Sequence, residues 1–119
     1  MHEVSLIRTV FSTLESEFTP EELERLEAID LQVGKLSNVE PTLLNNAFAA
    51  VTQAEGRYEN VALNIETVPI EVYCSVCDKN TLVKEYKFAC SCGLPSKDVV
   101  RGTELLIHRI HFSETTTVN

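Results

Sequence analysis

All four cysteines of this 119-residue chain lie in two close pairs. Cys74 and Cys77 have two residues between them, and Cys90 and Cys92 have a single serine between them. Four soft thiolates arranged in this way suit a tetrahedral Zn²⁺ ion that both loops bind at once. Because four protein ligands leave no open coordination position, the pattern predicts a structural zinc site rather than a catalytic one.

Two other chemistries are open to the same cysteines. They could form two disulfides, which would suit a secreted chain, or Cys74 and Cys77 could act as a redox-active dithiol. The start of the chain lacks the positive and apolar regions of a signal peptide, and no apolar run reaches the roughly 18 residues of a membrane span. We therefore expect a cytosolic protein with no membrane role. In that reducing compartment, paired cysteines more often bind metal.

The first three residues offer a second set of metal ligands. The α-amine of Met1, the following backbone nitrogens and the imidazole of His2 place several nitrogen donors close together. Ni²⁺ and Cu²⁺ favour square-planar nitrogen ligation. An α-amine has a pKa of about 7.7–8.0, so metal affinity should fall as the pH drops. The alternative is that His2 is an exposed polar residue and that Glu3 places a favourable charge at a helix N-terminus.

The other two histidines, His108 and His111, fall on a predicted strand. Because they are three positions apart, we expect their side chains on opposite faces, where they cannot readily share one metal. His108 is interpreted as a core or rim histidine, and neither is assigned to the nickel site. Asp30, Glu66 and Glu71 are interpreted as solvent-exposed strand positions.

Composition narrows the classes of partner and activity. The chain has 18 acidic and 10 basic residues and a net charge of −8. Nucleic-acid binding requires a basic footprint, so we expect none here. Metal cations and basic protein surfaces are the better match. The chain also lacks the GxSxG, HExxH, P-loop and GxGxxG patterns, so we expect no enzymatic activity.

The hydrophobic pattern predicts the elements that carry these ligands. Apolar residues recur in steps of three and four from Val4 to Phe18 and again after Pro41, which predicts two amphipathic helices. Between them, Thr19 to Glu22 reads as the capping box of a short helix. Alternating apolar residues predict strands over 29–33 and 61–65. Apolar residues on both faces of 105–112 predict a third strand that is central or well covered.

The predicted fold class is α+β, with two helices packed on a three-stranded sheet and an inserted zinc-ribbon-like subdomain. We expect an α/β domain formed by residues 1–69 and 103–113, and a flexible tail at 114–119. The zinc-binding subdomain should span 70–102, hinge near Pro69 and Gly102, and end in a loop over 94–102. The predicted core joins strand and helix residues: Val33, Leu63, Ile65 and Ile107 on the sheet, and Ile7, Phe11, Leu14, Leu44 and Phe48 on the helices.

Three segments in this order resemble the HypA/HybF family of nickel metallochaperones. They are Met1-His2-Glu3-x-Ser5, Val33-Gly34-x-Leu36-Ser37 and the four-cysteine loop, and Glu104-Leu105 in the last strand fits as well. The resemblance covers nearly the whole chain. The sequence departs from the family pattern at Cys90-Ser91-Cys92, where a two-residue spacer is usual.

The resemblance implies a nickel site at Met1, His2 and Glu3. It also implies a separate zinc site at Cys74, Cys77, Cys90 and Cys92. It also implies delivery of Ni²⁺ to maturing nickel–iron hydrogenase and, in some organisms, to urease. The implied partners are a nickel-handling GTPase, the hydrogenase large subunit and urease accessory proteins, and a homodimer is compatible with it. The competing hypothesis is a zinc-ribbon adaptor that acts only through protein contacts, in which the N-terminus has no role.

Overall fold

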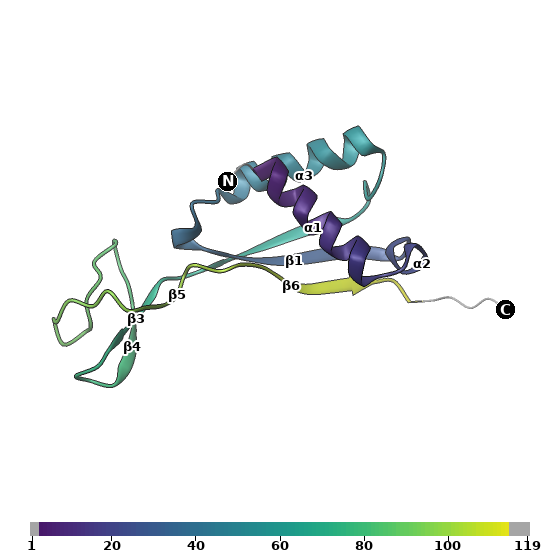
Figure 1. The fold of residues 1–119 in the computed structure, drawn as a ribbon. Coiled ribbons are helices and arrows are strands. Elements are labelled where there is room, and N and C mark those ends of the chain that lie inside the picture. The colour runs from purple at the N-terminus through teal and green to yellow at the C-terminus, as the bar shows by residue number, and fades with distance from the viewer. Residues whose placement is uncertain (1–2, 115–119) are drawn as a thin grey trace.

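The computed structural model describes residues 3–114 as two small sheets joined end to end, in a molecule that measures 61 × 31 × 20 Å (Figure 1). The first sheet has the order β2-β1-β6 and comprises β1 (Leu26–Gly34), β2 (Ala62–Val68) and β6 (Leu105–Phe112). The second has the order β4-β3-β5 and comprises β3 (Glu71–Cys74), β4 (Lys79–Leu82) and β5 (Val99–Arg101). The second sheet is therefore an insertion between β2 and β6. The exact domain boundaries stay a prediction.

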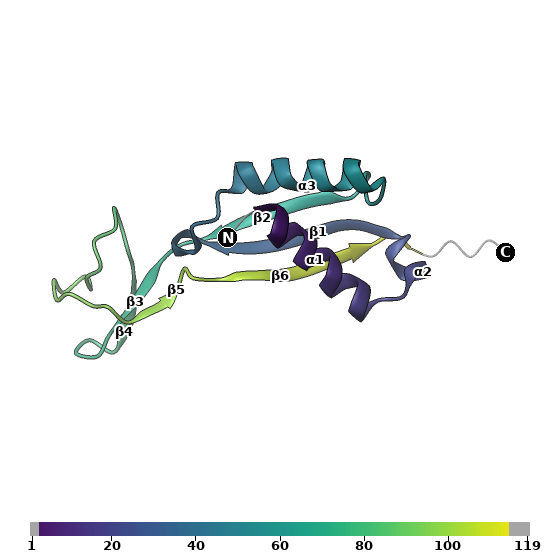
Figure 2. The same ribbon diagram turned by 45° about the horizontal axis from the view of Figure 1, so that its top comes forward.

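Two helices, α1 (Glu3–Glu17) and α3 (Pro41–Glu55), cover one face of the first sheet (Figure 2). The short helix α2 (Pro20–Leu23) has the predicted capping box. The Thr19 hydroxyl accepts from the Glu22 backbone N–H, and the Glu22 carboxylate accepts from the Thr19 N–H. A 3₁₀ turn, η1 (Lys35–Ser37), leads into α3, which ends as predicted at Gly56 in the left-handed conformation. No helix among the described residues is long and apolar enough to cross a membrane.

The predicted core is confirmed, because every sheet and helix residue named for it belongs to one buried hydrophobic cluster or, for Leu63, Ile65 and Ile107, packs against it partly buried. Ile7, Leu44 and Val33 are fully or almost fully buried, and the Phe11 and Phe48 rings lie 5.8 Å apart. Val4, in contrast, is exposed, so its place on the apolar seam of α1 was wrong. The buried stripe is centred on Ile7, Val10 and Leu14, and Val4 falls at its flank.

The prediction of a central or well-covered last strand is also wrong. Among the strands of residues 3–114, β6 pairs only with β1 and is an edge strand. The pairing register shifts between Asp30 and Leu31 of β1, which marks a β-bulge. Leu105 and Ile107 point into the core before the shift, and Ile110 and Phe112 do so after it. The residues of β6 that face the core therefore have odd numbers before the shift and even numbers after it. In the sequence, this pattern looks like a strand with apolar residues on both faces.

Gly34 and Gly102 lie where the backbones of the two sheets cross closely. The Gly34 N–H donates to the Glu104 carbonyl at 2.7 Å, and the Leu36 N–H donates to the Gly102 carbonyl at 2.8 Å. A Cβ atom on Gly34 would lie 2.1 Å from the Gly102 carbonyl oxygen. Gly102, expected at a hinge, is thus buried in a close backbone crossing, where its N–H donates to the Glu104 carboxylate. Residues 94–102, expected to be loop, include β5, which hydrogen-bonds to β3.

Candidate metal centre

Each cysteine pair is held on a tight turn. Cys74 ends β3, and its carbonyl accepts from the Asp78 N–H at 2.7 Å as the chain reverses into β4. The Cys90 carbonyl accepts from the Gly93 N–H at 2.9 Å, and the Cys90 N–H donates to the Leu94 carbonyl. Asp78 and Gly93 have positive φ angles, which close the two turns. The second turn is thus regular in spite of its shorter Cys-x-Cys spacing.

The turns bring the four thiols into one cluster. All four Sγ atoms lie within 4.8 Å of one another, and those of Cys74 and Cys92 are 4.0 Å apart. A tetrahedral ion with metal–sulfur bonds of about 2.3 Å needs sulfur atoms roughly 3.8 Å apart. All four cysteines are free thiols. The cluster therefore fits a tetrahedral metal ion with only a small contraction, and it needs no change in backbone topology.

The thiols of the cluster are not equivalent. Cys74 and Cys90 are buried, whereas Cys77 and Cys92 are exposed. Hydrogen bonds from the Cys92 backbone and from Thr81 lower the pKa of Cys90 to about 6. Hydrogen bonds with Cys92 and Cys90 raise the pKa of Cys77 to about 12. Without a metal the Cys77 thiol therefore keeps its proton at neutral pH, and an incoming cation must displace it.

The second sheet fixes the positions of these turns. Val72 of β3 is fully buried, and the Tyr73 N–H donates to the Asp98 carbonyl at 2.8 Å. The Ser96 hydroxyl donates to the Tyr73 carbonyl, which ties the segment after the second cysteine pair to β3. These contacts join segments that are far apart in the sequence. Sequence patterns alone therefore did not show them.

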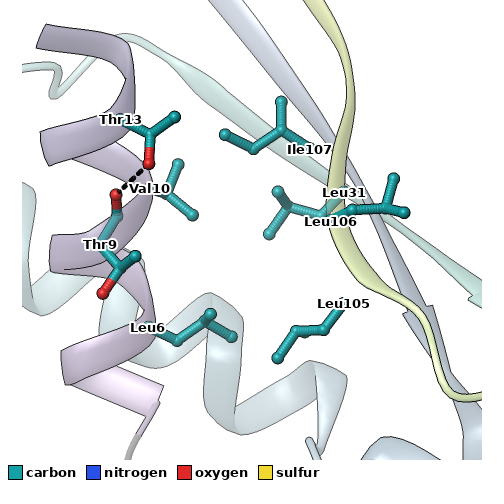
Figure 3. Close-up of a pocket in the computed structure, with 8 residues that line it drawn as sticks. All are labelled: Leu6, Thr9, Val10, Thr13, Leu31, Leu105, Leu106 and Ile107. Carbon is teal, nitrogen blue, oxygen red and sulfur yellow. Dashed lines mark hydrogen bonds between the residues drawn. The ribbon is translucent and has the colours of Figure 1, made fainter. Parts of the chain in front are cut away.

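The structure describes one of the three predicted N-terminal ligands. Met1 and His2 are outside the described residues, and Glu3 is the first residue of the helix, partly buried. The first turns of α1 face the end of β6 next to the junction, because Leu6 lies across a hollow from Leu105 (Figure 3). Glu104, the residue before Leu105, bonds to Gly34 and Gly102. The N-terminal end of α1 is therefore on the side of the α/β unit that faces the second sheet.

The hollow itself is no metal site. It has a volume of about 280 Å³ and lies between α1 and the edge strand β6 (Figure 3). The Thr9 and Thr13 hydroxyls donate to carbonyls of their own helix, four residues earlier. None of its lining residues is a histidine, cysteine or carboxylate: Leu6, Thr9, Val10, Thr13, Leu31, Leu105, Leu106 and Ile107.

The histidines of β6 lie on the same face of the sheet, which corrects the expectation that they point apart. His111 Nε2 is 2.8 Å from the Asp30 carboxylate, and His108 lines an open hollow together with Asp30. The bulge in β6 adds one residue to the alternation and so brings both rings to the uncovered face. His108 is exposed, not a core residue. The only metal-ligand cluster among residues 3–114 is still the four-cysteine one.

Glu66 is exposed, as expected, whereas Asp30 and Glu71 are partly buried, and all three carboxylates have partners on a neighbouring strand. Asp30 also accepts from the Asn64 amide at 2.9 Å, and its hydrogen bonds with His111 and Asn64 lower its pKa. Glu66 accepts from Gln32, and Glu71 pairs with Arg101 at 2.9 Å. These are cross-strand contacts, and the pattern of a single strand does not reveal them.

Comparison with known proteins identifies the family. The sequence model described as "Hydrogenase/urease nickel incorporation, metallochaperone, hypA" matches residues 1–112. The chain belongs to the HypA family. A "Hydrogenase maturation factor HypA" of Desulfitobacterium hafniense is 33% identical over 115 residues, which cover 96% of this chain and all of the relative. One of Acidithiobacillus ferrooxidans is 34% identical over 114 residues, with coverage of 92% and 97%.

Solved structures agree on the fold. The "Solution structure of the Ni metallochaperone HypA from Helicobacter pylori" matches with a TM-score of 0.63 and 19% identity, covering 94% of this chain and 97% of that one. A second, "Solution structure of HypA protein", matches with a TM-score of 0.66 and 18% identity, covering 95% and 97%. The HypA family is one of metallochaperones rather than enzymes, and it acts in nickel incorporation during hydrogenase maturation.

Proposed function

We propose that this protein binds Ni²⁺ at its N-terminus and delivers it to maturing nickel–iron hydrogenase, while a zinc ion bound by its four cysteines has a structural role. Membership of the HypA family supports the nickel role. The observation that carries the zinc role is the cluster of four Sγ atoms within 4.8 Å of one another.

Zinc is the metal proposed for the four-cysteine cluster because four thiolates form a closed set. Such a set suits zinc, and it leaves no open position through which a cargo ion could be passed on. The insertion also buries few apolar residues of its own, so a metal would supply the stability that its core lacks. The residues proposed to bind it are Cys74, Cys77, Cys90 and Cys92.

Nickel is proposed to bind through the Met1 amine, the backbone nitrogens of His2 and Glu3 and the His2 imidazole. These donors match the planar nitrogen geometry that Ni²⁺ favours. They precede α1, which begins at Glu3 on the side of the α/β unit that faces the second sheet. An ion there would be accessible to a partner, as transfer requires. Protonation of the amine would release it at lower pH.

The proposed partners are those of the nickel pathway. They are a nickel-handling GTPase, the hydrogenase large subunit and, where urease is present, its accessory proteins, all met in the cytosol. The net charge of −8 favours partner surfaces of opposite charge and argues against a nucleic-acid partner. The proposal assigns no catalytic residue.

Nickel titration of the untagged protein tests the nickel site. We expect one Ni²⁺ per chain with a diamagnetic, planar-type absorption spectrum. His2→Ala should abolish this site without unfolding the protein, because a terminal side chain contributes little to stability. Two residues added before Met1 should also abolish it, because the amine becomes an amide while every side chain stays in place.

The extension variant separates this hypothesis from the adaptor hypothesis. Equal nickel affinity in the extended and native proteins would contradict binding through the terminal amine. If neither protein binds nickel while zinc remains bound, the adaptor hypothesis is favoured. The zinc content of each sample, measured by mass spectrometry, is the control, since both variants should retain about one zinc per chain.

A further inference from the structure

The cysteine cluster has a neighbour that is not a cysteine. Thr81 lies on β4 and pairs with Val72 of β3, so the two side chains share one face of the second sheet. Val72 is fully buried and Thr81 is partly buried, which shows that other parts of the subdomain cover this face. The Thr81 hydroxyl donates to Cys90 Sγ across 3.7 Å.

Thr81 makes a connection that no other β4 side chain makes. β4 supplies no cysteine and lies between the two pairs in the sequence. Asn80, the preceding residue, pairs with Tyr73 and is exposed. The hydroxyl of Thr81 therefore links the hairpin of the first cysteine pair to the buried thiol of the second.

Cys90 also has polar groups other than thiols close to its sulfur. Besides Thr81, the backbone of Cys92 bonds to its sulfur, and the Ser91 hydroxyl lies 4.0 Å away. A buried thiolate has lost its water, so each donor that faces it stabilises the charge and fixes the direction of its lone pairs. Outer partners of metal ligands typically contribute 10–100-fold in metal affinity.

We infer that Thr81 is a positioning residue of the four-cysteine centre, whose hydroxyl orients the Cys90 thiolate toward the metal. The inference rests on the proposed zinc role of the cluster. The Cys-x-Cys pair is thus held in part by a threonine on β4, a strand that supplies no metal ligand. Thr81 itself does not bind the ion.

Thr81→Val tests this inference, because valine keeps the shape and strand propensity of threonine but has no hydroxyl. Zinc affinity would be measured by competition with a chromophoric chelator. We expect Thr81→Val to bind zinc about 10–100-fold more weakly and Thr81→Ser to stay within about threefold of the wild type. Asn80→Ala is the matched control on the same strand and should leave the affinity unchanged.

Two further readouts separate positioning from general destabilisation. In the cobalt-substituted protein, Thr81→Val should shift the sulfur-to-metal charge-transfer band, whereas Asn80→Ala should not. With iodoacetamide, Cys90 of zinc-loaded Thr81→Val should be alkylated faster than in the wild type, as read by peptide mass spectrometry. Affinity, spectrum and labelling that all equal the wild type would overturn the inference. If the wild-type protein binds no ion through its four thiolates, it is the proposed zinc role that fails.

Discussion

The two sheets of this protein have three strands each, but they differ in how they are stabilised. The first is covered by α1 and α3 over a continuous core that includes the fully buried Ile7, Ile29 and Leu44. In the second, the fully described stretch 70–102 buries Ile70 and Val72 as its only apolar side chains besides Cys74 and Cys90. It leaves Val76 and Tyr86 75% and 63% exposed.

This difference separates the roles of hydrophobic burial and metal binding. The stabilisation from the hydrophobic effect is proportional to the apolar area that is buried. A small sheet that no helix covers buries little area and therefore gains little stability in this way. The second sheet instead places four thiols within 4.8 Å of one another, and a bound ion would stabilise it through coordination. The first sheet should fold without metal, and the second should depend on it.

The largest expected effect comes from removing a thiol. Cys77→Ser should release the zinc and disorder the second sheet while the α/β unit stays folded, because the unit has its own core. Zinc analysis and an amide NMR spectrum would show the loss of metal and the collapse of signals from residues 70–102 alone. Ser75→Ala, in the same turn, is the control and should change neither. Retention of a full zinc equivalent by Cys77→Ser would contradict the four-cysteine ligand set.

A substitution in the core of the first sheet should destabilise the α/β unit and not the second sheet. Phe48 is 7% exposed and contacts Phe11, so Phe48→Ala should destabilise the α/β unit by roughly 3–5 kcal/mol. Leu43→Ala, on the same helix but 51% exposed, should cost less than about 1 kcal/mol. Chemical denaturation monitored by circular dichroism measures both. Equal losses in the two variants would show that burial on α3 does not decide its stability.

The junction between the sheets gives a smaller effect. In Gly34→Ala the new methyl group would overlap the Gly102 carbonyl, which should cost roughly 1–3 kcal/mol and move the second sheet relative to the first. Gly56→Ala is the control: its φ of 63° is strained for alanine, but no atom lies within 4 Å of the new methyl group. Residual dipolar couplings should report a new sheet orientation only for Gly34→Ala. An unchanged orientation would mean that this crossing does not set it.

The smallest expected effect is a pH-dependent change in stability at Asp30, on the face of the first sheet that no helix covers. Hydrogen bonds with His111 and Asn64 lower the pKa of Asp30, so the folded protein binds this proton more weakly than the unfolded chain. The stabilisation is therefore complete above the ordinary aspartate pKa of about 3.9 and is lost as the pH falls through the lower folded value. Urea midpoints of wild type and Asp30→Asn should differ at pH 7 and converge as the pH falls below the lowered pKa of folded Asp30. Glu17→Gln, an exposed helix position, is the control for the loss of one charge.

The sequence by itself determined the parts that depend on local periodicity and local chemistry. The steps of three and four in α1 and α3, the capping box at Thr19 and Glu22, and the stop at Gly56 all follow from short-range rules. The two cysteine pairs were also readable, because each pair belongs to one turn. Family motifs covered the chain from Met1 to the last strand, although Met1 and His2 lie outside the described residues.

Only the tertiary structure decided what depends on pairing between distant strands. The bulge in β6 arises from its register against β1, so the shared face of His108 and His111 and the contact of His111 with Asp30 could not be read from alternation. The same holds for Thr81 of β4, whose contact with Cys90 joins the first cysteine hairpin to a separate turn later in the chain. The crossing of Gly34 and Gly102 likewise joins the end of β1 to the end of the insertion, far apart in the sequence. Sequence periodicity reports the surroundings of one strand, whereas these contacts depend on which strand lies beside it.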